Sequence, residues 1–235
     1  MTVLDSPLLQ VTLRDELRAA WIKLRNEHAQ EQIYGFGVFT TDSASYLTVT
    51  AFSEAGLDAA VAKYLASKHG KGKDPALLGQ SLRWSAADSP LHSVGSELLP
   101  QSDKIVQELD FEGRWAADDD ADEDGDDDED DGEEDDDFDE AELQDPEVEE
   151  VFQVIVQVLR ELDQEGLFGT GAERERLVLS VWEGDQSNVS RYDYAKALNP
   201  PAVAKRFGAE MNAGLRAFYQ VYMPGQELPA DDVFD

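Results

Sequence analysis

One stretch of this sequence contains almost nothing but acidic side chains. Residues 118–142 hold 20 aspartates and glutamates in 25 positions, and no lysine or arginine occurs between Arg114 and Arg160. Such a stretch has too little apolar surface to offset the entropy lost on folding, and its carboxylates repel one another at neutral pH. We therefore expect residues 117–145, called the acidic segment below, to be a long disordered insertion.

The net charge limits the partners of the chain. The 235 residues carry a formal charge of −33, and removing the 20 acids of residues 118–142 leaves 32 acids against 19 bases, or −13. An acidic surface repels the phosphates of nucleic acids and of anionic membranes, whereas a basic protein complements it. The sequence therefore predicts a basic protein partner, with no direct binding to nucleic acid or membrane.

Cysteine content and the first residues indicate the compartment. The chain has no cysteine, which excludes disulfides, thiolate nucleophiles and cysteine metal sites. The start, Met1 to Gln10, lacks the basic region and the apolar run of a secretory signal, and no stretch resembles a membrane span. We expect a cytoplasmic protein without a cofactor.

Periodic apolar residues predict the helices and strands. Helical spacing favours helices at Leu13–Ala29 with Thr12 as N-cap, Glu54–Ser67 with Ser53 as N-cap, residues 146–166, Ala202–Tyr222 and, more briefly, Asp103–Leu109. Apolar, β-branched and aromatic runs favour a hairpin of Ile33–Thr41 with Tyr46–Phe52, a central strand at Arg176–Trp182 and a short strand at Ser81–Ser85. Residues 86–100 look irregular.

These elements predict the fold class and the packing of a few residues. We expect an α+β fold, in which one domain over residues 1–235 is interrupted by the acidic segment. A mainly antiparallel sheet of four or five strands, packed by helices, would bury all the apolar faces. Gly35 and Gly37 leave a flat track on their strand that another element can approach closely, and Phe168 fills the core.

Two patterns could bind ions. Asp120, Asp122 and Asp124 match the first half of an EF-hand calcium loop, although a match arises almost automatically in so acidic a stretch, and diffuse counterion attraction is the alternative. Lysines and glycines alternate in residues 68–74, so this loop with His69 could cradle a phosphate, attract the acidic segment, or be an exposed helix end.

The remaining candidates are partner contacts and catalytic residues. The three histidines, His28, His69 and His92, lie on separate predicted elements and lack the spacing of a metal site, so no catalytic residue is assigned. Residues of the acidic segment and a neighbouring tryptophan are the candidate contacts to a basic partner: Asp126, Asp127, Asp128, Glu133, Glu134 and Trp115.

Five separated pieces give the chain a family resemblance. They are residues 33–36 with 40–42, Arg83-Trp84-Ser85, residues 166–169, residues 177–181 and Leu198-Asn199-Pro200. In this order they resemble a bacterial domain of unknown function, number four-three-zero-three. Where that family tends to continue its R-W-S piece with an acid and a second tryptophan, this chain has Asp88-Ser89. The resemblance implies one α+β domain and, because similar proteins occur beside secreted toxins, an immunity role; it implies no catalytic site.

These observations predict a non-enzymatic acidic binding protein, and most specifically an immunity protein that neutralises a basic toxin. Three alternatives stay open. The acidic segment could make the chain a calcium- or cation-responsive module, it could merely improve the solubility of a housekeeping domain, or the chain could be an enzyme with a carboxylate-lined cleft.

Overall fold

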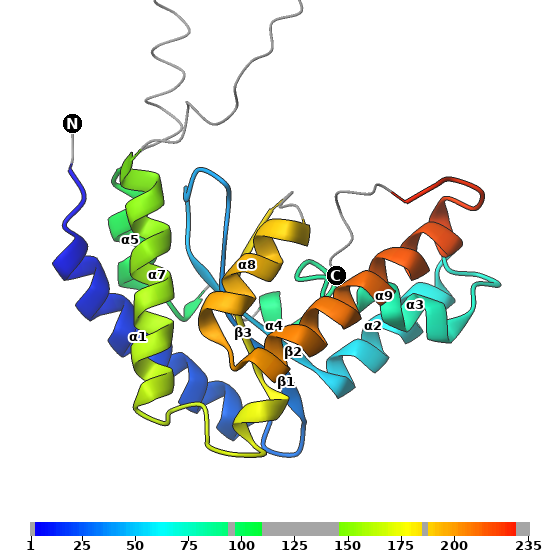
Figure 1. Ribbon diagram of the computed structural model, residues 1–235, viewed down its shortest axis with the longest axis horizontal. Helices are drawn as coiled ribbons and strands as arrows, with labels where there is room; N and C mark the ends of the chain where they lie inside the picture. The colour runs from blue at the N-terminus through cyan, green and yellow to red at the C-terminus, as the bar shows by residue number, and fades with distance from the viewer. Residues whose placement is uncertain (1–2, 94–96, 110–145, 185–187, 229–235) are drawn as a thin grey trace, which may run out of the picture.

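The structure, a computed structural model, describes residues 3–93, 97–109, 146–184 and 188–228. The acidic segment lies outside the described residues, so its predicted disorder stays a prediction. The elements that the structure describes follow one another along the chain as shown in Figure 1: α1 (Ser6–Glu27), β1 (Ile33–Thr40), β2 (Thr48–Ser53), α2 (Glu54–Ala66), α3 (Pro75–Leu82), α4 (Pro90–Ser93), α5 (Pro100–Gln107), α7 (Pro146–Gln164), η3 (Arg174–Arg176), β3 (Val178–Glu183), α8 (Asn188–Leu198) and α9 (Pro201–Tyr222).

The α+β class is confirmed, but the predicted sheet is wrong. Within the described residues the sheet has three strands in the order β2-β1-β3, instead of four or five. The β1–β2 hairpin is antiparallel as predicted, whereas β1 and β3 pair in parallel from Gly35–Val178 to Thr40–Glu183. The chain between β2 and β3 crosses back through helices before it reaches β3, and this return sets the parallel direction.

The strand predicted to be central, at Arg176–Trp182, is β3, and it lies at an edge of the sheet. Its residues are nevertheless buried, because α7 contacts it from one side and α8 and α9 contact it from the other. A continuous apolar run reports that both faces of a strand are covered, and it does not report which strands lie beside it. The central strand is β1.

The predicted flat track on β1 is confirmed. A Cβ atom added at Gly37 would lie 1.9 Å from the Ser180 carbonyl oxygen and 2.7 Å from Cζ3 of Trp182. A Cβ atom at Gly35 would lie 2.8 Å from atoms of the Phe52 and Trp84 rings. The two glycines therefore let large aromatic rings lie directly on the strand.

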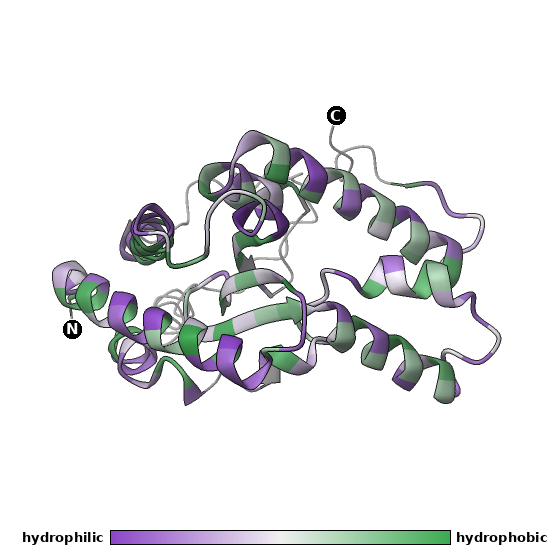
Figure 2. Ribbon diagram, turned by 90° about the horizontal axis from the view of Figure 1, so that it is seen from below, coloured by the Kyte–Doolittle hydropathy of each residue, from purple (hydrophilic) through white to green (hydrophobic). Residues whose placement is uncertain are grey.

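Each face of the sheet has its own core. On one face, α1, α5 and α7 cover apolar residues of all three strands, and Phe168 is buried there against Trp21 and Phe36, as predicted. On the other face, α8 and α9 cover a cluster rich in aromatic residues that includes Trp84 and Trp182. The ends of α2, α3 and α9 extend beyond the sheet and enclose a third, smaller cluster (Figure 2).

Two local predictions fail at helix starts. Helix α1 begins at Ser6, not after Thr12, because the Asp5 carboxylate accepts a hydrogen bond from the Leu8 amide at 3.0 Å. The predicted strand Ser81–Ser85 is instead the end of α3 and the turn after it. Asp74 caps α3 through the amides of Ala76 and Leu77, directly before a proline.

The other predicted helices are confirmed to within a few residues. Helix α2 starts after its predicted cap Ser53, whose hydroxyl accepts from the Gly56 amide at 3.0 Å. Helices α5, α7 and α9 cover the predicted regions, and α8, like the short α4 inside the region expected to be irregular, was not predicted. Among the helices described, none is long and apolar enough to cross a membrane.

Candidate functional site

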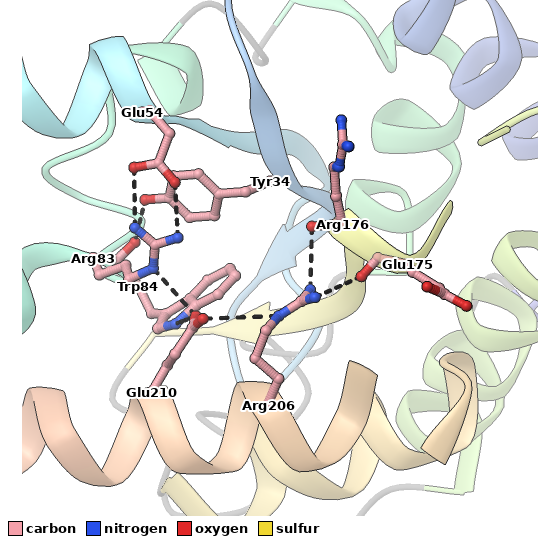
Figure 3. A network of polar contacts seen from close by, with 8 residues as sticks. All are labelled: Tyr34, Glu54, Arg83, Trp84, Glu175, Arg176, Arg206 and Glu210. Atoms are coloured by element: carbon pink, nitrogen blue, oxygen red, sulfur yellow. Dashed lines mark hydrogen bonds and ion pairs between the residues drawn. The ribbon is translucent and has the colours of Figure 1, made fainter. Parts of the chain in front are cut away.

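Arg83 is the centre of a charged network on the aromatic side of the sheet (Figure 3). Its two terminal nitrogens donate to both carboxylate oxygens of Glu54, at 3.1 and 2.9 Å, and its Nε donates to Glu210 at 3.1 Å. The guanidinium also lies over the ring of Tyr34, 4.1 Å from its centroid. One side chain thus joins α2, α9 and β1, and the two-pronged contact to Glu54 fixes its orientation.

Glu210 gathers further donors around the same point. The indole of Trp84 donates to it at 3.2 Å, and Nε of Arg206 lies 3.7 Å from its other oxygen. Arg206 also donates to the backbone carbonyls of Glu175 and Arg176, which lie just before β3. The network therefore connects α9 to the segments that enter both parallel strands (Figure 3).

The environment of the network shifts two pKa values. Burial alone lowers the pKa of Arg83, but the hydrogen bond to Glu54 and the charge of Glu210 outweigh it, so the net shift is upward. Burial raises the pKa of Tyr34, whose hydroxyl donates to the Arg83 carbonyl at 2.7 Å. Both groups keep their protons at neutral pH, so the network holds a fixed pattern of charge.

A cavity of about 150 Å³ opens beside this network, and Gln32, Arg176 and Arg206 contribute to its wall. The guanidinium of Arg176 points away from Glu210 in Figure 3. Among the described residues, Arg83 and Arg206 at this cavity both pair with Glu210, whereas none of the described ion pairs involves Arg176. These pairings fix the positions of the charged side chains around the cavity.

Trp84 lines both this cavity and a larger one. This second cavity, of about 360 Å³, has Trp182, Met211 and Phe218 in its wall and lies at the carboxyl ends of the parallel strands β1 and β3. Ligands often bind at this edge of parallel sheets. The Nε1 atom of Trp182 is buried and has no hydrogen-bond partner among the described residues.

Glu183, the last residue of β3, is the carboxyl with the most perturbed pKa that the structure describes near this cavity. Burial raises the pKa of Glu183 and outweighs the lowering by its hydrogen bond to Tyr194, so the pKa is about 7. The Tyr194 ring stacks on Phe152 of α7, at a centroid distance of 5.9 Å. The carboxyl therefore lies toward the α7 side of the sheet, although Glu183 also contributes to the cavity wall.

The predicted partner and calcium residues lie in the part of the chain that the structure does not describe. These are Asp126, Asp127, Asp128, Glu133, Glu134 and Trp115 for the partner, and Asp120, Asp122 and Asp124 for calcium. Within the described ranges no group of three histidines, aspartates or glutamates is arranged to hold a metal ion.

The three histidines do not meet in one site. His28 contacts Glu31 at 2.6 Å at the end of α1, and His92 of α4 lies against Phe39 with its ring centroid 4.8 Å away. His69 is in the wall of a third cavity together with Asp88. Among the described contacts no hydrogen bond joins His69 to Asp88, which accepts instead from Ser85.

Residues 13–200 match the sequence model of a domain of unknown function, DUF4303. The chain belongs to the DUF4303 family. No curated protein and no solved structure matches the chain. The five pieces that carried the resemblance all fall within the DUF4303 match, and the Arg83-Trp84-Ser85 piece supplies the centre of the network, a side chain that lines two cavities and the partner of Asp88.

Two other DUF4303 pieces have a structural role. The side-chain amide of Asn199 accepts from the Leu179 amide at 2.9 Å and donates to the Leu179 carbonyl at 2.6 Å, which imitates a neighbouring strand at the open edge of β3. Buried Arg174 holds Asn199 in place and pairs with Asp163 at 2.5 Å. The DUF4303 pieces therefore build the sheet edge as well as the network.

The network could not be found from the sequence. Arg83 and Trp84 belong to a piece that the sequence singled out, but Glu54 lies 29 residues and Glu210 lies 127 residues from Arg83. No local spacing connects them, and with 52 acids in the chain the composition could not select these two.

Proposed function

We propose that the protein is a non-enzymatic, cytoplasmic binding protein whose acidic segment recognises a basic protein, and that this partner is a toxin which the protein neutralises. The observation that carries the proposal is the position of the negative charge along the chain. The acidic segment holds 21 acids and no base, so it contributes −21 of the net −33. The described residues hold 25 acids and 18 bases, which leaves them at −7.

The elements on either side of the acidic segment support this reading. Helices α5 and α7 precede and follow it, and both pack on α1. The first turns of α7 add Glu147, Glu149 and Glu150 directly after it in the sequence. A concentrated negative charge speeds the encounter with a basic protein and orients it, and this effect weakens as salt screens it.

The test is a calorimetric titration of the full chain with the most basic protein encoded next to its gene. We expect binding that weakens steeply between low and high salt. The substitutions D126N, D127N, D128N, E133Q and E134Q together lower the affinity about tenfold or more at low salt. A matched control removes five exposed carboxylates from the described surface, with D15N, E27Q, D58N, E97Q and E227Q.

The two variants lose the same number of charges, so they separate local recognition from net charge. Equal effects of both sets would show that only the overall charge matters. A full chain that binds neither neighbouring gene product at low salt contradicts the toxin-neutralising role.

A further inference from the structure

A third cavity lies where the far ends of α2 and α9 meet α3. Its volume is about 570 Å³, within the range of small-molecule sites. Three aromatic rings contribute to its wall, Tyr64 from α2 and Phe218 and Tyr222 from α9. Phe218 is 39% exposed, and its ring centroid lies 5.0 Å from that of Tyr222. The half-exposed Phe218 ring therefore offers an aromatic face in the cavity wall, on which a planar group can stack.

A carboxylate in the wall provides hydrogen-bond acceptors beside these rings. Asp88 accepts from the Ser85 hydroxyl at 2.6 Å and lies near the phenol of Tyr64. An ionised carboxylate can accept about four hydrogen bonds, so these neighbours leave part of its capacity unused. Asp88 can thus accept from the N–H groups of a bound ring.

Basic side chains lie at the same cavity. Lys63 of α2 and His69 of the loop after α2 are both in its wall, and Lys68 and Lys71 belong to that loop. This is the loop whose lysines and glycines suggested a phosphate cradle in the sequence. In a chain with 52 acids and 19 bases, such a concentration of positive charge marks a place suited to an anion.

The loop is held in position by packing and is not simply a frayed helix end. The Lys73 ammonium lies 5.3 Å from the Tyr222 ring centroid and donates to the Val221 carbonyl. Gly70 is buried, and a Cβ atom there would lie 2.0 Å from the Tyr64 carbonyl oxygen. The loop thus packs closely on both α2 and α9, so its backbone is held in place before any ligand arrives.

We propose that this cavity binds a free nucleotide, that is, a planar base carrying a phosphate. The base stacks on Phe218 and donates to Asp88, and the phosphate lies on the side of Lys63 and His69. A purely apolar ligand would leave Asp88 without new donors, and a cationic ligand would be repelled by the lysines. The site is separate from the proposed recognition of a basic protein and does not depend on it.

The position of the cavity explains how an acidic protein can accept an anion. Figure 1 shows α2, α3 and α9 extending away from the side where α5 and α7 flank the acidic segment. At physiological salt, charges are screened beyond about 8 Å. A single nucleotide therefore responds mainly to the lysines near it, whereas a long nucleic acid also meets the acidic remainder of the molecule.

The experiment is isothermal titration of the full chain with AMP, adenosine and ribose 5-phosphate at about 0.15 M salt. We expect AMP to bind at least about tenfold more tightly than either fragment, because it alone uses both the rings and the cations. Phe218→Ala and Phe218→Leu both weaken AMP binding about tenfold. The leucine variant keeps most of the apolar volume, so it serves as the test if the alanine variant folds poorly. Lys63→Gln weakens AMP and leaves adenosine unchanged.

Lys23→Gln is the matched control, because it removes an exposed lysine of α1, outside the wall of this cavity. It leaves AMP binding unchanged. Three results overturn the proposal. The first is no heat of binding up to about 5 mM AMP. The second is equal affinity for AMP and adenosine, and the third is tighter binding of a short oligonucleotide than of AMP. None of these results involves a protein partner, so they leave the proposed recognition of a basic protein untouched.

Discussion

Single residues in this protein have roles that their neighbours in the sequence do not reveal. Gly37 was expected to permit a close approach, and the approach is real, but the sequence did not show that Trp182 of β3 lies over it. Trp84 is 6% exposed, and its hydrogen bond to Glu210 depends on a residue 126 positions away. Residue types predict burial well, and they do not predict partners.

Glu183 gives a pH-dependent prediction at the same scale. Its folded pKa of about 7 lies above the ordinary value of 4.5, so the folded chain binds the extra proton more tightly than the unfolded chain does. Stability from this group is therefore present below pH 4.5 and is lost as the pH rises through 7. The glutamine in Glu183→Gln cannot titrate. Between pH 5 and pH 8 the free energy of unfolding of this variant therefore rises by about 1–2 kcal/mol relative to that of the native protein, a value that is reduced for the partial exposure of Glu183.

Urea unfolding of both proteins at pH 5 and pH 8 measures this difference. The other carboxylates titrate equally in the two proteins, so their contributions cancel. A gap between the two free energies of unfolding that stays the same at both pH values would show that burial does not raise the pKa of Glu183.

At the scale of elements, helices were predicted correctly where the sequence contained both a recognisable start and a regular apolar spacing. The Ser53 cap and the apolar stripe of α7 predicted their helices, because capping and 3.6-residue spacing act within a few residues. The strand predicted at Ser81–Ser85 failed because Asp74-Pro75, a helix start, was not recognised before it. The parallel pairing of β3 with β1 could not be predicted from the sequence, since it depends on how the helices between β2 and β3 turn the chain.

Arg83 tests how strongly the elements depend on one another. Its side chain is 24% exposed and its partners Glu54 and Glu210 are 43% and 27% exposed. Arg83→Ala removes the side chain that links Glu54 of α2 to Glu210 of α9, so we expect a loss of about 2–3 kcal/mol in the free energy of unfolding. Arg83→Lys keeps the charge but loses the two-pronged contact, and we expect about half that loss.

Urea denaturation of each variant measures the change. Lys104→Ala is the control, because Lys104 and Glu108 are exposed, pair at 3.6 Å only four residues apart and join no elements. If Arg83→Ala costs no more than the control, the network is not what holds α9 against α2.

At the scale of the molecule, the acidic segment and the described fold have separable roles. The family match extends across the segment, from residue 13 to residue 200, while the residues that build the sheet and its cores lie before and after it. Replacing residues 117–145 with about 12 glycines and serines changes the loop-closure term by only about 1 kcal/mol, because that term grows with the logarithm of length. The net charge falls from −33 to −12, since 21 acids and no base are removed.

We therefore expect the shortened protein to unfold at the same urea concentration as the full chain in high salt, and at a slightly higher one in low salt, where self-repulsion is strongest. The same protein loses the salt-dependent part of its binding to a basic partner but keeps its AMP titration, because the cavity between α2, α3 and α9 is unchanged. Urea unfolding at two salt concentrations and the two titrations measure these effects. A shortened chain that no longer folds would show that the acidic segment contributes contacts to the fold, and the division of roles would then be wrong.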